Sequence, residues 1–305
     1  MAISEVSLDQ IHAITGGELL INDAAHQRIT QLLTDSRKVV NTESSLFFAI
    51  KGDNHDGHEF IEDLIQSGVH NFIISNKNSW KPEFKANAIV VADALLAMQQ
   101  IAGSHRSHFR IPVIGITGSN GKTIVKEWLY QLLREDKNIV RSPKSYNSQI
   151  GVPLSVWQMT EENNFGIFEA GISRPGEMQN LERIIHPTMG IFTNVGTAHD
   201  ENFSSPEEKV REKLSLFTNC SIVFFCRDYP EIYTAVNTLP ESVIRFSWSR
   251  KVKADLQIAR ITKKDQETEI QGIYKNRFIE ISIPFIDDAS VENAVLCWAV
   301  LLFLG

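Results

Sequence analysis

The chain is built from short apolar runs that alternate with longer segments of helical spacing. The opening segment, residues 8–15, shows the helical type: Ser7 and Gln10 form a capping-box pair, apolar residues recur every three positions from Leu8, and Gly16 ends the helix. The same reasoning predicts further elements up to residue 107. They are strands at 46–50, 71–75 and 89–91 and helices at 59–66 and 92–107.

A polar stretch at residues 105–110 separates this region from the rest, so we place a domain boundary there, with domains at 1–109 and 110–305. The second region continues the alternation. Strands are predicted at 111–114, 139–140, 166–169, 190–194, 221–226, 256–261, 268–274 and 278–283, and helices at 124–134, 149–158, 177–185, 206–217 and 289–304. Apolar strands separated by helices indicate a parallel sheet covered on both faces, and the last three strands form an antiparallel extension. The expected fold class is α/β, with a small N-terminal domain followed by a mostly parallel-sheet domain.

Composition narrows the class of protein. A length of 305 residues fits two domains, and a net charge of −7 argues against a general nucleic-acid binder. No apolar run reaches the roughly 18 residues of a membrane-spanning helix, and the N-terminus has no signal-peptide pattern. Cys220, Cys226 and Cys297 lack metal-ligand spacing and fit reduced thiols, so we expect a cytoplasmic protein.

The stretch at 114–123, Ile-Gly-Ile-Thr-Gly-Ser-Asn-Gly-Lys-Thr, joins a predicted strand to a predicted helix. Glycines at such a junction let backbone N–H groups face phosphate oxygens, Lys122 adds a positive charge, and the Thr123 hydroxyl can hold Mg²⁺. The spacing departs from the usual G-x-x-x-x-G-K-[ST] because Ile116 stands where that pattern has glycine. The alternative is a glycine-rich turn that binds nothing. We expect Gly118, Ser119, Asn120, Gly121, Lys122 and Thr123 to bind a nucleoside triphosphate.

Several separated motifs together resemble one family, the ATP-dependent Mur ligases of peptidoglycan synthesis. In the first domain they lie at 34–37 (Thr-Asp-Ser-Arg), 45–52, 56–61 and 68–69. In the second they lie at 118–123, 146–147, 150–154, 169–171, 193–196, 198–199 and at Lys213. The residues at 151–154, 169–173 and 175–177 are most similar to the branch that adds D-alanyl-D-alanine to UDP-N-acetylmuramoyl-tripeptide.

The resemblance implies a ligase that uses ATP and Mg²⁺ and acts on those two substrates through an acyl phosphate. It implies catalytic roles for Lys122, His199 and Lys213, with Lys213 carbamylated, and a contribution of Asn293 to nucleotide binding. Thr123, Glu169, His199 and Lys213 are the implied metal ligands, and Ser36, Arg37 and Asn147 the implied substrate contacts. Glu169 also ends an apolar strand, so it would lie at the carboxyl edge of the sheet, where ligands bind. A carboxylate at that edge is a hard oxygen ligand that suits Mg²⁺.

Each of these residues also has an ordinary structural interpretation. Glu169 could be solvated or cap a helix, His199 could be structural, Asn147 could be a turn residue, and Arg37, following Asp-Ser, could belong to an ordinary turn pair. The segment 207–213, Glu-Glu-Lys-Val-Arg-Glu-Lys, by itself predicts a solvated, salt-bridged helix face, so only the resemblance gives Lys213 a functional role.

The sequence departs from the family pattern at Ser145 and Ser148 and at Ser290–Glu292, where only Asn293 is kept. The resemblance also implies a third, dinucleotide-binding-type domain that this chain lacks, so the chain alone is expected to be inactive. Other hypotheses are another Mur ligase, a folylpolyglutamate synthetase-like ligase, a nucleotide-dependent binding or switch protein, and a non-catalytic nucleotide-binding fragment. Whether the full-length protein carries a fused downstream module stays open.

Overall fold

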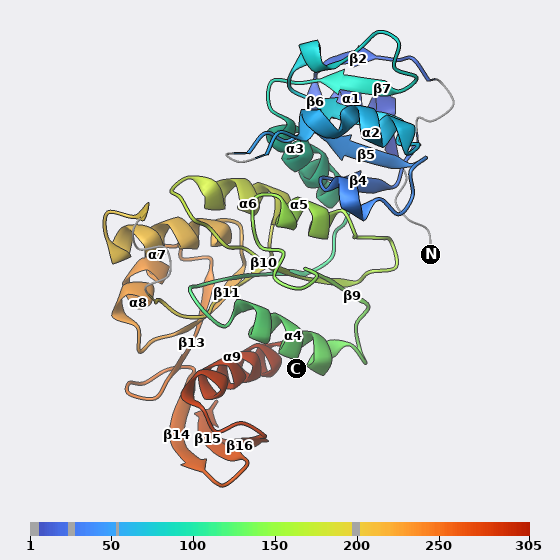
Figure 1. Ribbon diagram of the computed structural model, residues 1–305. Coiled ribbons are helices and arrows are strands. Elements are labelled where there is room, and N and C mark those ends of the chain that lie inside the picture. The colour runs from blue at the N-terminus through green and yellow to red at the C-terminus, as the bar shows by residue number, and fades with distance from the viewer. Residues whose placement is uncertain (1–5, 24–27, 53–54, 197–201) are drawn as a thin grey trace. The chain divides into compact units, whose positions relative to one another are not determined.

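Figure 1 shows a computed structural model, which describes residues 6–23, 28–52, 55–196 and 202–305. The chain divides into two compact units. The first comprises Met1–Phe109 together with Pro153–Glu161, and the second comprises Arg110–Val152 and Glu162–Gly305. The assignment of a sugar-nucleotide domain at 1–109 and an ATP domain at 110–305 stays a prediction.

The first unit is built on a five-stranded sheet in the order β2-β7-β6-β5-β4. Strands β4 to β7 are parallel, and β2 joins β7 antiparallel. Every residue of β5 and β6 is buried, as expected for strands covered on both faces. On one face Phe47 and Phe72 pack with Ile61 and Leu64.

The bounds of the first unit's elements follow. The strands are β1 Val6–Ser7, β2 Glu18–Leu20, β3 Arg28–Ile29, β4 Gln31–Leu33, β5 Ser45–Phe48, β6 Asn71–Ile74 and β7 Asn87–Val90. The helices are α1 Leu8–Thr15, α2 Ile61–Gln66 and α3 Ala94–Ser107, with 3₁₀ turns η1 Ser36–Lys38, η2 Gly57–Phe60 and η3 Lys77–Ser79. The predicted capping box of α1 is confirmed, because Ser7 and Gln10 exchange hydrogen bonds of 2.8 and 3.2 Å.

The second unit is built on a nine-stranded sheet in the order β16-β15-β14-β13-β12-β11-β8-β10-β9. The strands are β8 Val113–Thr117, β9 Ile139–Arg141, β10 Phe165–Glu169, β11 Met189–Phe192, β12 Ile222–Cys226, β13 Ile244–Ser249, β14 Leu256–Lys263, β15 Thr268–Tyr274 and β16 Arg277–Ile283. Pairing is parallel from β9 to β14 and antiparallel from β14 to β16. The carboxyl ends of β8, β10 and β11 therefore meet at one edge of the sheet.

Helices cover both faces of this sheet (Figure 1). Helices α4 Lys122–Leu133 and α9 Asp288–Leu304 pack on one face. Helices α6 Glu177–Ile185, α7 Pro206–Leu214 and α8 Pro230–Val236, with the 3₁₀ turn η5 Ser215–Phe217, lie on the other. A further helix, α5, spans Gly151–Val156.

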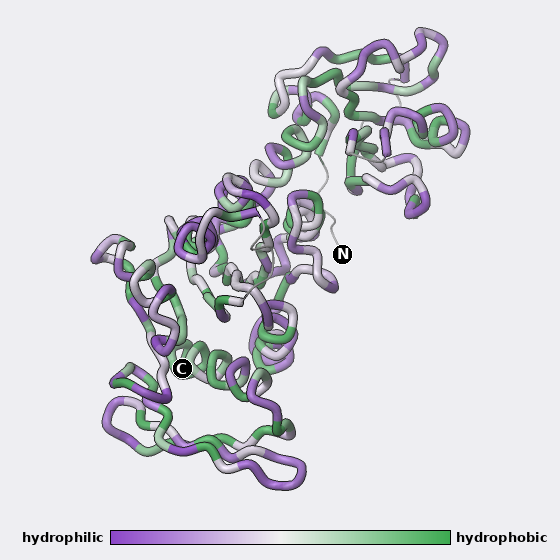
Figure 2. The backbone as a smooth tube through the Cα atoms, turned by 60° about the vertical axis from the view of Figure 1, so that its left-hand side comes forward, coloured by the Kyte–Doolittle hydropathy of each residue, from purple (hydrophilic) through white to green (hydrophobic). Residues whose placement is uncertain are grey.

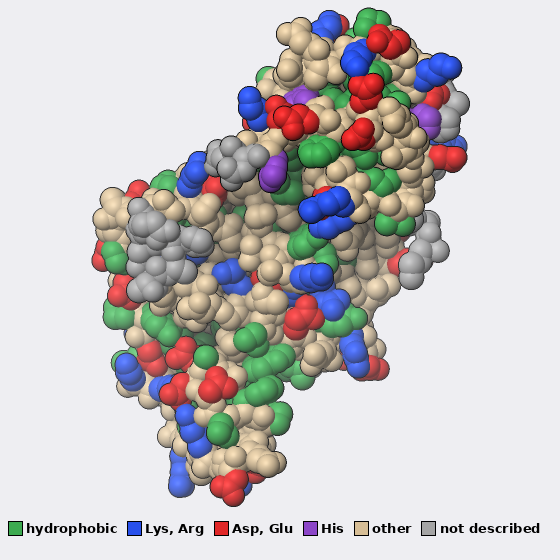
Figure 3. Space-filling model, in the orientation of Figure 1, with side chains coloured by type: hydrophobic (Ala, Val, Ile, Leu, Met, Phe, Trp, Pro, Cys, Tyr) green, Lys and Arg blue, Asp and Glu red, His purple; other side chains and the backbone are tan. Residues whose placement is uncertain are grey.

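Helix α9 is apolar along most of its length, as the green tube beside the C-terminal label in Figure 2 shows. It is buried against α4, β12 and β13, which accounts for apolar residues on all its sides. Hydrophobic side chains also gather on the surface over α4 and α9 (Figure 3), where Ile124 and Phe303 stay exposed. Among the residues described, no helix combines the length and hydrophobicity needed to cross a bilayer.

The predicted α/β class with a mostly parallel sheet is confirmed, and the bounds of α6 and β15 were predicted to the residue. In the second unit the sequence did not predict α8 and β13, and in the first unit it did not predict the short strands β1 to β4. The predicted strand 190–194 ends at Phe192, because Thr193 and Asn194 turn toward the loop after β8. The predicted helix 206–217 is α-helical only to Leu214 and tightens into η5.

We expect Gly190→Ala to destabilise the second unit. Gly190 lies in β11, and a Cβ there would be 2.4 Å from Cδ1 of Phe217. Overpacking of this kind costs about 1–3 kcal/mol of unfolding free energy, against about 0.5 kcal/mol or less for the exposed control Glu241→Ala. Urea unfolding followed by circular dichroism measures both, and equal midpoints for the two variants would contradict the packing argument.

Candidate functional site

The loop between β8 and α4 depends on two glycines with left-handed backbone angles. Gly118 has φ +136° and Gly121 has φ +82°. A Cβ on Gly118 would be 2.0 Å from Oγ1 of Thr193, and one on Gly121 would be 2.4 Å from Oδ1 of Asn293. Any side chain at either position would displace its neighbour, so the sequence requires glycine at both.

The same loop is anchored to the end of β11. The Thr193 hydroxyl donates to the Asn120 carbonyl at 2.6 Å. The amides of Ser119 and Asn120 each donate to Asn194 at 3.0 Å, the first to its backbone oxygen and the second to its side chain. Gly121 offers no capping side chain, so the first amides of α4 have no intrahelical partner and can face an anion.

Lysine side chains surround this loop. Nζ of Lys122 donates to the Gly118 carbonyl at 2.7 Å, and Nζ of Lys213 donates to the same oxygen at 3.4 Å. Nζ of Lys209 donates to the Gly196 carbonyl at 2.6 Å. Lys209 and Lys213 lie one turn apart on α7, and both are buried. The expectation of a solvated helix face is therefore wrong for these two lysines and holds for Glu207 and Arg211.

Burial changes the acid–base behaviour of this cluster. Burial and then the neighbouring charges of Lys122 and Lys209 lower the pKa of Lys213 to about 7. Burial likewise lowers the pKa of Lys122, although the charge of Glu169 opposes that shift. Near neutral pH, Lys213 is thus present in large part as the free amine, which is the nucleophilic form.

Glu169 ends β10 and lies entirely buried behind Thr123. The Thr123 hydroxyl donates to Oε2 of Glu169 at 2.9 Å. Nζ of Lys126, also fully buried, lies 2.9 Å from Oε1 of Glu169. A hydroxyl and a carboxylate held together at the start of the loop helix are the hard oxygen ligands that suit Mg²⁺, so the residues present fit that ion.

Two asparagines predicted for the site lie beside these groups. Asn293, on the second turn of α9, is buried against Gly121. Asn147 accepts a hydrogen bond of 2.8 Å from the amide of Gly171, two residues beyond Glu169. The structure therefore brings both asparagines to the sheet edge that carries the loop.

Three predicted residues remain, His199, Ser36 and Arg37. His199 lies outside the described residues. Ser36 and Arg37 lie in η1 of the first unit. Arg37 is largely exposed and pairs with Asp35 at 2.8 Å, and this pairing holds the pKa of Asp35 well below its usual range. Within the part of the chain that is described, no three His, Cys, Asp or Glu side chains form a metal-type cluster.

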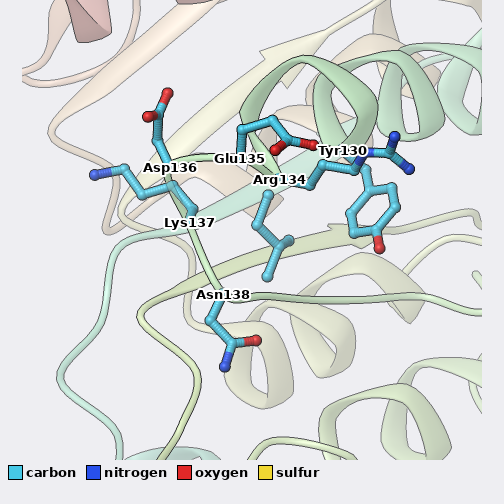
Figure 4. A pocket seen from close by; sticks show the side chains of 7 residues that line it. Tyr130, Arg134, Glu135, Asp136, Lys137 and Asn138 are labelled. Atoms are coloured by element: carbon cyan, nitrogen blue, oxygen red, sulfur yellow. Dashed lines mark ion pairs between the residues drawn. The ribbon is translucent and has the colours of Figure 1, made fainter.

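A surface hollow of about 400 Å³ lies elsewhere on the second unit, at the opposite end of α4 from the loop (Figure 4). Tyr130, Arg134 and Asn138 are among the residues that line it. The hollow is open and polar and contacts none of the residues predicted for catalysis. It is therefore not the candidate site.

Two buried lysines of the site were missed from the sequence. Lys126 falls on the same side of α4 as the core residues Val125, Leu129 and Leu133. A charged residue on an apolar stripe is a sequence pattern that indicates a buried charge. Lys209 lies one helical turn before Lys213, so a buried Lys213 implies burial at 209. The roles of all these residues stay predictions.

Fold and site together define an α/β protein with a phosphate-type loop at the carboxyl edge of a mostly parallel sheet. Residues 116–301 match the profile of the Mur ligase middle domain, and residues 28–106 match that of the Mur ligase family, catalytic domain. The chain belongs to the Mur ligase family.

One relative, the UDP-N-acetylmuramoyl-tripeptide–D-alanyl-D-alanine ligase of Treponema pallidum, is 30% identical over 96% of this chain and 65% of its own length. Two solved structures share the fold. MurF from Acinetobacter baumannii has a TM-score of 0.87 at 24% identity over 100% of this chain and 66% of its own. MurF from Thermotoga maritima in complex with ADP has a TM-score of 0.79 at 23% identity, over 90% of this chain and 63% of its own. The chain thus spans less than two thirds of the length of these proteins.

The shifted pKa of Lys213 generates a prediction for stability against pH. Between pH 7 and 10.5 the unfolded chain holds a proton on this lysine that the folded chain has lost, so stability rises with pH in that window. From pH 7 to 9 the rise due to this group is up to about 2 kcal/mol, at about 1.4 kcal/mol per pH unit. Urea unfolding in metal-free, CO₂-depleted buffer measures it.

The variant Lys213→Met lacks the titrating group. Its stability is expected to rise less between pH 7 and pH 9 than that of the wild-type chain, and to exceed the wild-type value at pH 7. A matched change at the exposed Lys137, Lys137→Met, leaves the wild-type pH dependence in place. A rise in Lys213→Met as large as in the wild-type chain would show that Lys213 is not desolvated.

Proposed function

We propose that the protein is an ATP-dependent ligase of peptidoglycan precursor synthesis that adds D-alanyl-D-alanine to UDP-N-acetylmuramoyl-tripeptide. In this reaction ATP phosphorylates the terminal carboxylate of the tripeptide, and the amine of D-alanyl-D-alanine displaces phosphate from the acyl phosphate. Membership of the Mur ligase family and the name of the Treponema relative support the proposal.

The observation that carries the proposal is the convergence of charge at the loop. Lys122 and Lys213 share the carbonyl of Gly118, and Lys209 lies one turn from Lys213 on α7. The ammonium groups of Lys122 and Lys209, both near Lys213, attract a polyanion. A triphosphate supplies the missing negative charge, and the free amides at the start of α4 bind its oxygens.

The chemistry of the first step is mainly positioning and charge neutralisation. The ammonium of Lys122 faces the β- and γ-phosphates and stabilises the charge that develops as the γ-phosphoryl group leaves. The Thr123 hydroxyl and the Glu169 carboxylate would hold Mg²⁺, which would neutralise charge on the phosphate oxygens as a Lewis acid. Asn293 lies against Gly121 on the α9 side of the loop, where it contributes to nucleotide binding.

The unprotonated amine of Lys213 is suited to carbamylation. Its neutral nitrogen attacks the carbon of CO₂, an N–C bond forms as one C–O π bond of CO₂ breaks, and the nitrogen releases a proton, so that a neutral amine becomes an anionic carbamate. A carbamate beside the lysines Lys122 and Lys209 gains cation partners, and with His199 it would serve as a second metal ligand. The lowered pKa of Lys213 supports this step, because a lysine at its ordinary pKa is almost wholly protonated at pH 7.

Substrate contacts complete the proposal. Ser36 and Arg37 of the first unit bind the UDP moiety, and Asn147, beside Gly171, binds the sugar nucleotide or a phosphate. The first unit is then the sugar-nucleotide domain and the second the ATP domain. A cytoplasmic location follows from the precursor substrates, and the described cysteines are all unpaired and buried.

Phosphate release from ATP tests the function. We expect release that requires both UDP-N-acetylmuramoyl-tripeptide and D-alanyl-D-alanine, measured with the longest polypeptide in which this chain occurs. Phosphate release in the absence of both substrates would favour a switch protein. Equal release with folate and glutamate would favour a folylpolyglutamate synthetase-like enzyme.

Lys122→Ala is expected to weaken ATP binding by about tenfold or more while leaving the fold intact, because a charge-assisted contact to phosphate contributes about 1.5–3 kcal/mol. Calorimetric titration with ATP measures the loss, and circular dichroism checks the fold. Lys137→Ala, on the exposed end of the segment after α4, serves as the matched control. Unchanged ATP affinity in Lys122→Ala would show that the loop is not the nucleotide site.

Lys213→Ala is expected to abolish ligation and to be partly rescued by short carboxylates such as acetate. The added acid occupies the space of the lost side chain and supplies the oxygen ligand that the carbamate provides. Ligation is measured against carboxylate concentration, with Lys209→Ala in parallel, since that variant removes a buried lysine that is no carbamate donor. Wild-type ligation in Lys213→Ala without added carboxylate would contradict the carbamate role.

A further inference from the structure

Lys126 is a fully buried lysine whose ammonium touches three separate segments. It donates to the carbonyl of Ser142 at 2.7 Å and to the carbonyl of Lys144. Its Nζ lies 2.9 Å from Oε1 of Glu169 and 3.1 Å from Oε1 of its helix neighbour Glu127. Helix α4, the turn after β9 and the end of β10 therefore meet at one cation.

Stability alone does not account for this arrangement. Taking an ammonium and a carboxylate out of water costs as much as, or more than, their attraction returns, and an apolar residue of similar size is often equally stable in such a place. Lys126 sits among Val125, Leu129 and Leu133, where a methionine or leucine would extend the core. The reason for a charged residue here therefore lies in the groups that its ammonium holds in place.

The first group it holds is the Glu169 carboxylate. Oε2 of Glu169 accepts the Thr123 hydroxyl, so the carboxylate is fixed from both sides. Oε1 faces Lys126 without the alignment of a hydrogen bond, and in the described residues it has no hydrogen-bond donor. The charge of Lys126 orients that oxygen, which can still accept a hydrogen bond from a water molecule or bind a cation.

The second group it holds is the turn at 142–144. Lys144 has φ +50°, a left-handed conformation that is unfavourable for a residue with a side chain, and its carbonyl points to Lys126. The Ser142 hydroxyl accepts the amide of Glu169 at 3.2 Å, which ties the turn to β10. The turn leads directly to Asn147, so its conformation also sets the position of that side chain.

We propose that Lys126 is a positioning residue of the nucleotide–metal site. Its ammonium holds Glu169 against Thr123 and fixes the turn beside it, so that the oxygen ligands for a divalent cation are in place before the cation arrives. The inference rests on the proposed function, because it takes the loop to bind a nucleotide with Mg²⁺. It adds a residue to which neither the sequence motifs nor the family resemblance gave a role.

Calorimetric titration with ADP, in the presence and absence of Mg²⁺, tests the proposal on the 305-residue chain. The quantity compared is the gain in ADP affinity that Mg²⁺ brings. Lys126→Met is expected to reduce this gain about tenfold or more, as loss of a group that orients a metal ligand does. ADP affinity without metal is expected to change by less than about threefold, because Lys122 and the α4 amides bind the phosphates directly. The exposed-site control Lys137→Met keeps the wild-type gain.

A second pair of variants covers the case in which Lys126→Met fails to fold because the buried carboxylate has lost its cation. Glu169→Gln removes that carboxylate, and Lys126→Met/Glu169→Gln removes both charges. Since Lys126 acts on the metal through Glu169, the double variant is expected to show the same small Mg²⁺-linked gain as Glu169→Gln. A further loss in the double variant would show that Lys126 acts by another route and would overturn the proposal.

The outcomes separate this inference from the proposed function. A wild-type chain that binds ADP in neither condition contradicts the nucleotide site itself. A wild-type chain with a Mg²⁺-linked gain that Glu169→Gln loses and Lys126→Met retains overturns the role of Lys126 alone. Loss of the gain in both single variants, with the fold intact, supports it.

Discussion

The site depends on the burial of several lysine side chains at the carboxyl edge of one sheet. Lys126 and Lys209 are at most 1% exposed and Lys213 is 4% exposed, and among the described residues one buried carboxylate, Glu169, lies with them. The positive charge of Lys126 and Lys209 away from water is unfavourable unless oxygen atoms surround it. The backbone meets part of that requirement, since carbonyls of Gly118, Ser142 and Gly196 each accept from a lysine. The triphosphate proposed as the ligand would meet the rest.

The sheet topology explains how residues so distant in sequence reach one place. Strand β8 lies between β10 and β11, all three parallel, so the loop after β8, the end of β10 and the end of β11 lie side by side. This arrangement gives the loop its Glu169 from one neighbour and its Thr193 and Asn194 anchors from the other. The loop is thereby held from both sides by backbone and side-chain hydrogen bonds before any ligand binds, which lowers the entropy cost of binding.

Much of this could be predicted from the sequence, because local signals were strong. The capping box of α1, the apolar strands and the Gly-Lys-Thr junction are short-range patterns, and the resemblance supplied Glu169, Lys213 and Asn293. Strand β13 and helix α8 were missed because β13 begins with an exposed Ile244 and an Arg245, which mask its alternation, and because Pro230 at the start of α8 also resembles a turn. Lys126 and Lys209 were missed because burial of a lysine depends on tertiary partners, such as the Ser142 and Gly196 carbonyls, that no local pattern reveals.

Helix α9 shows that the core and the site are not separable. Its middle, including Val295, Leu296 and Ala299, belongs to the same core cluster as Val125 and Leu129 of α4, so packing alone fixes the two helices together. That packing places Asn293 against Gly121, where there is no room for a Cβ. A cavity introduced deep in this cluster would therefore move Asn293 relative to the loop as well as reduce stability. Neither loop glycine has room for a methyl group, so a small shift of Asn293 would disturb the loop. The geometry of the phosphate-type loop therefore depends on the hydrophobic packing of α9 as much as on the polar residues of the loop itself.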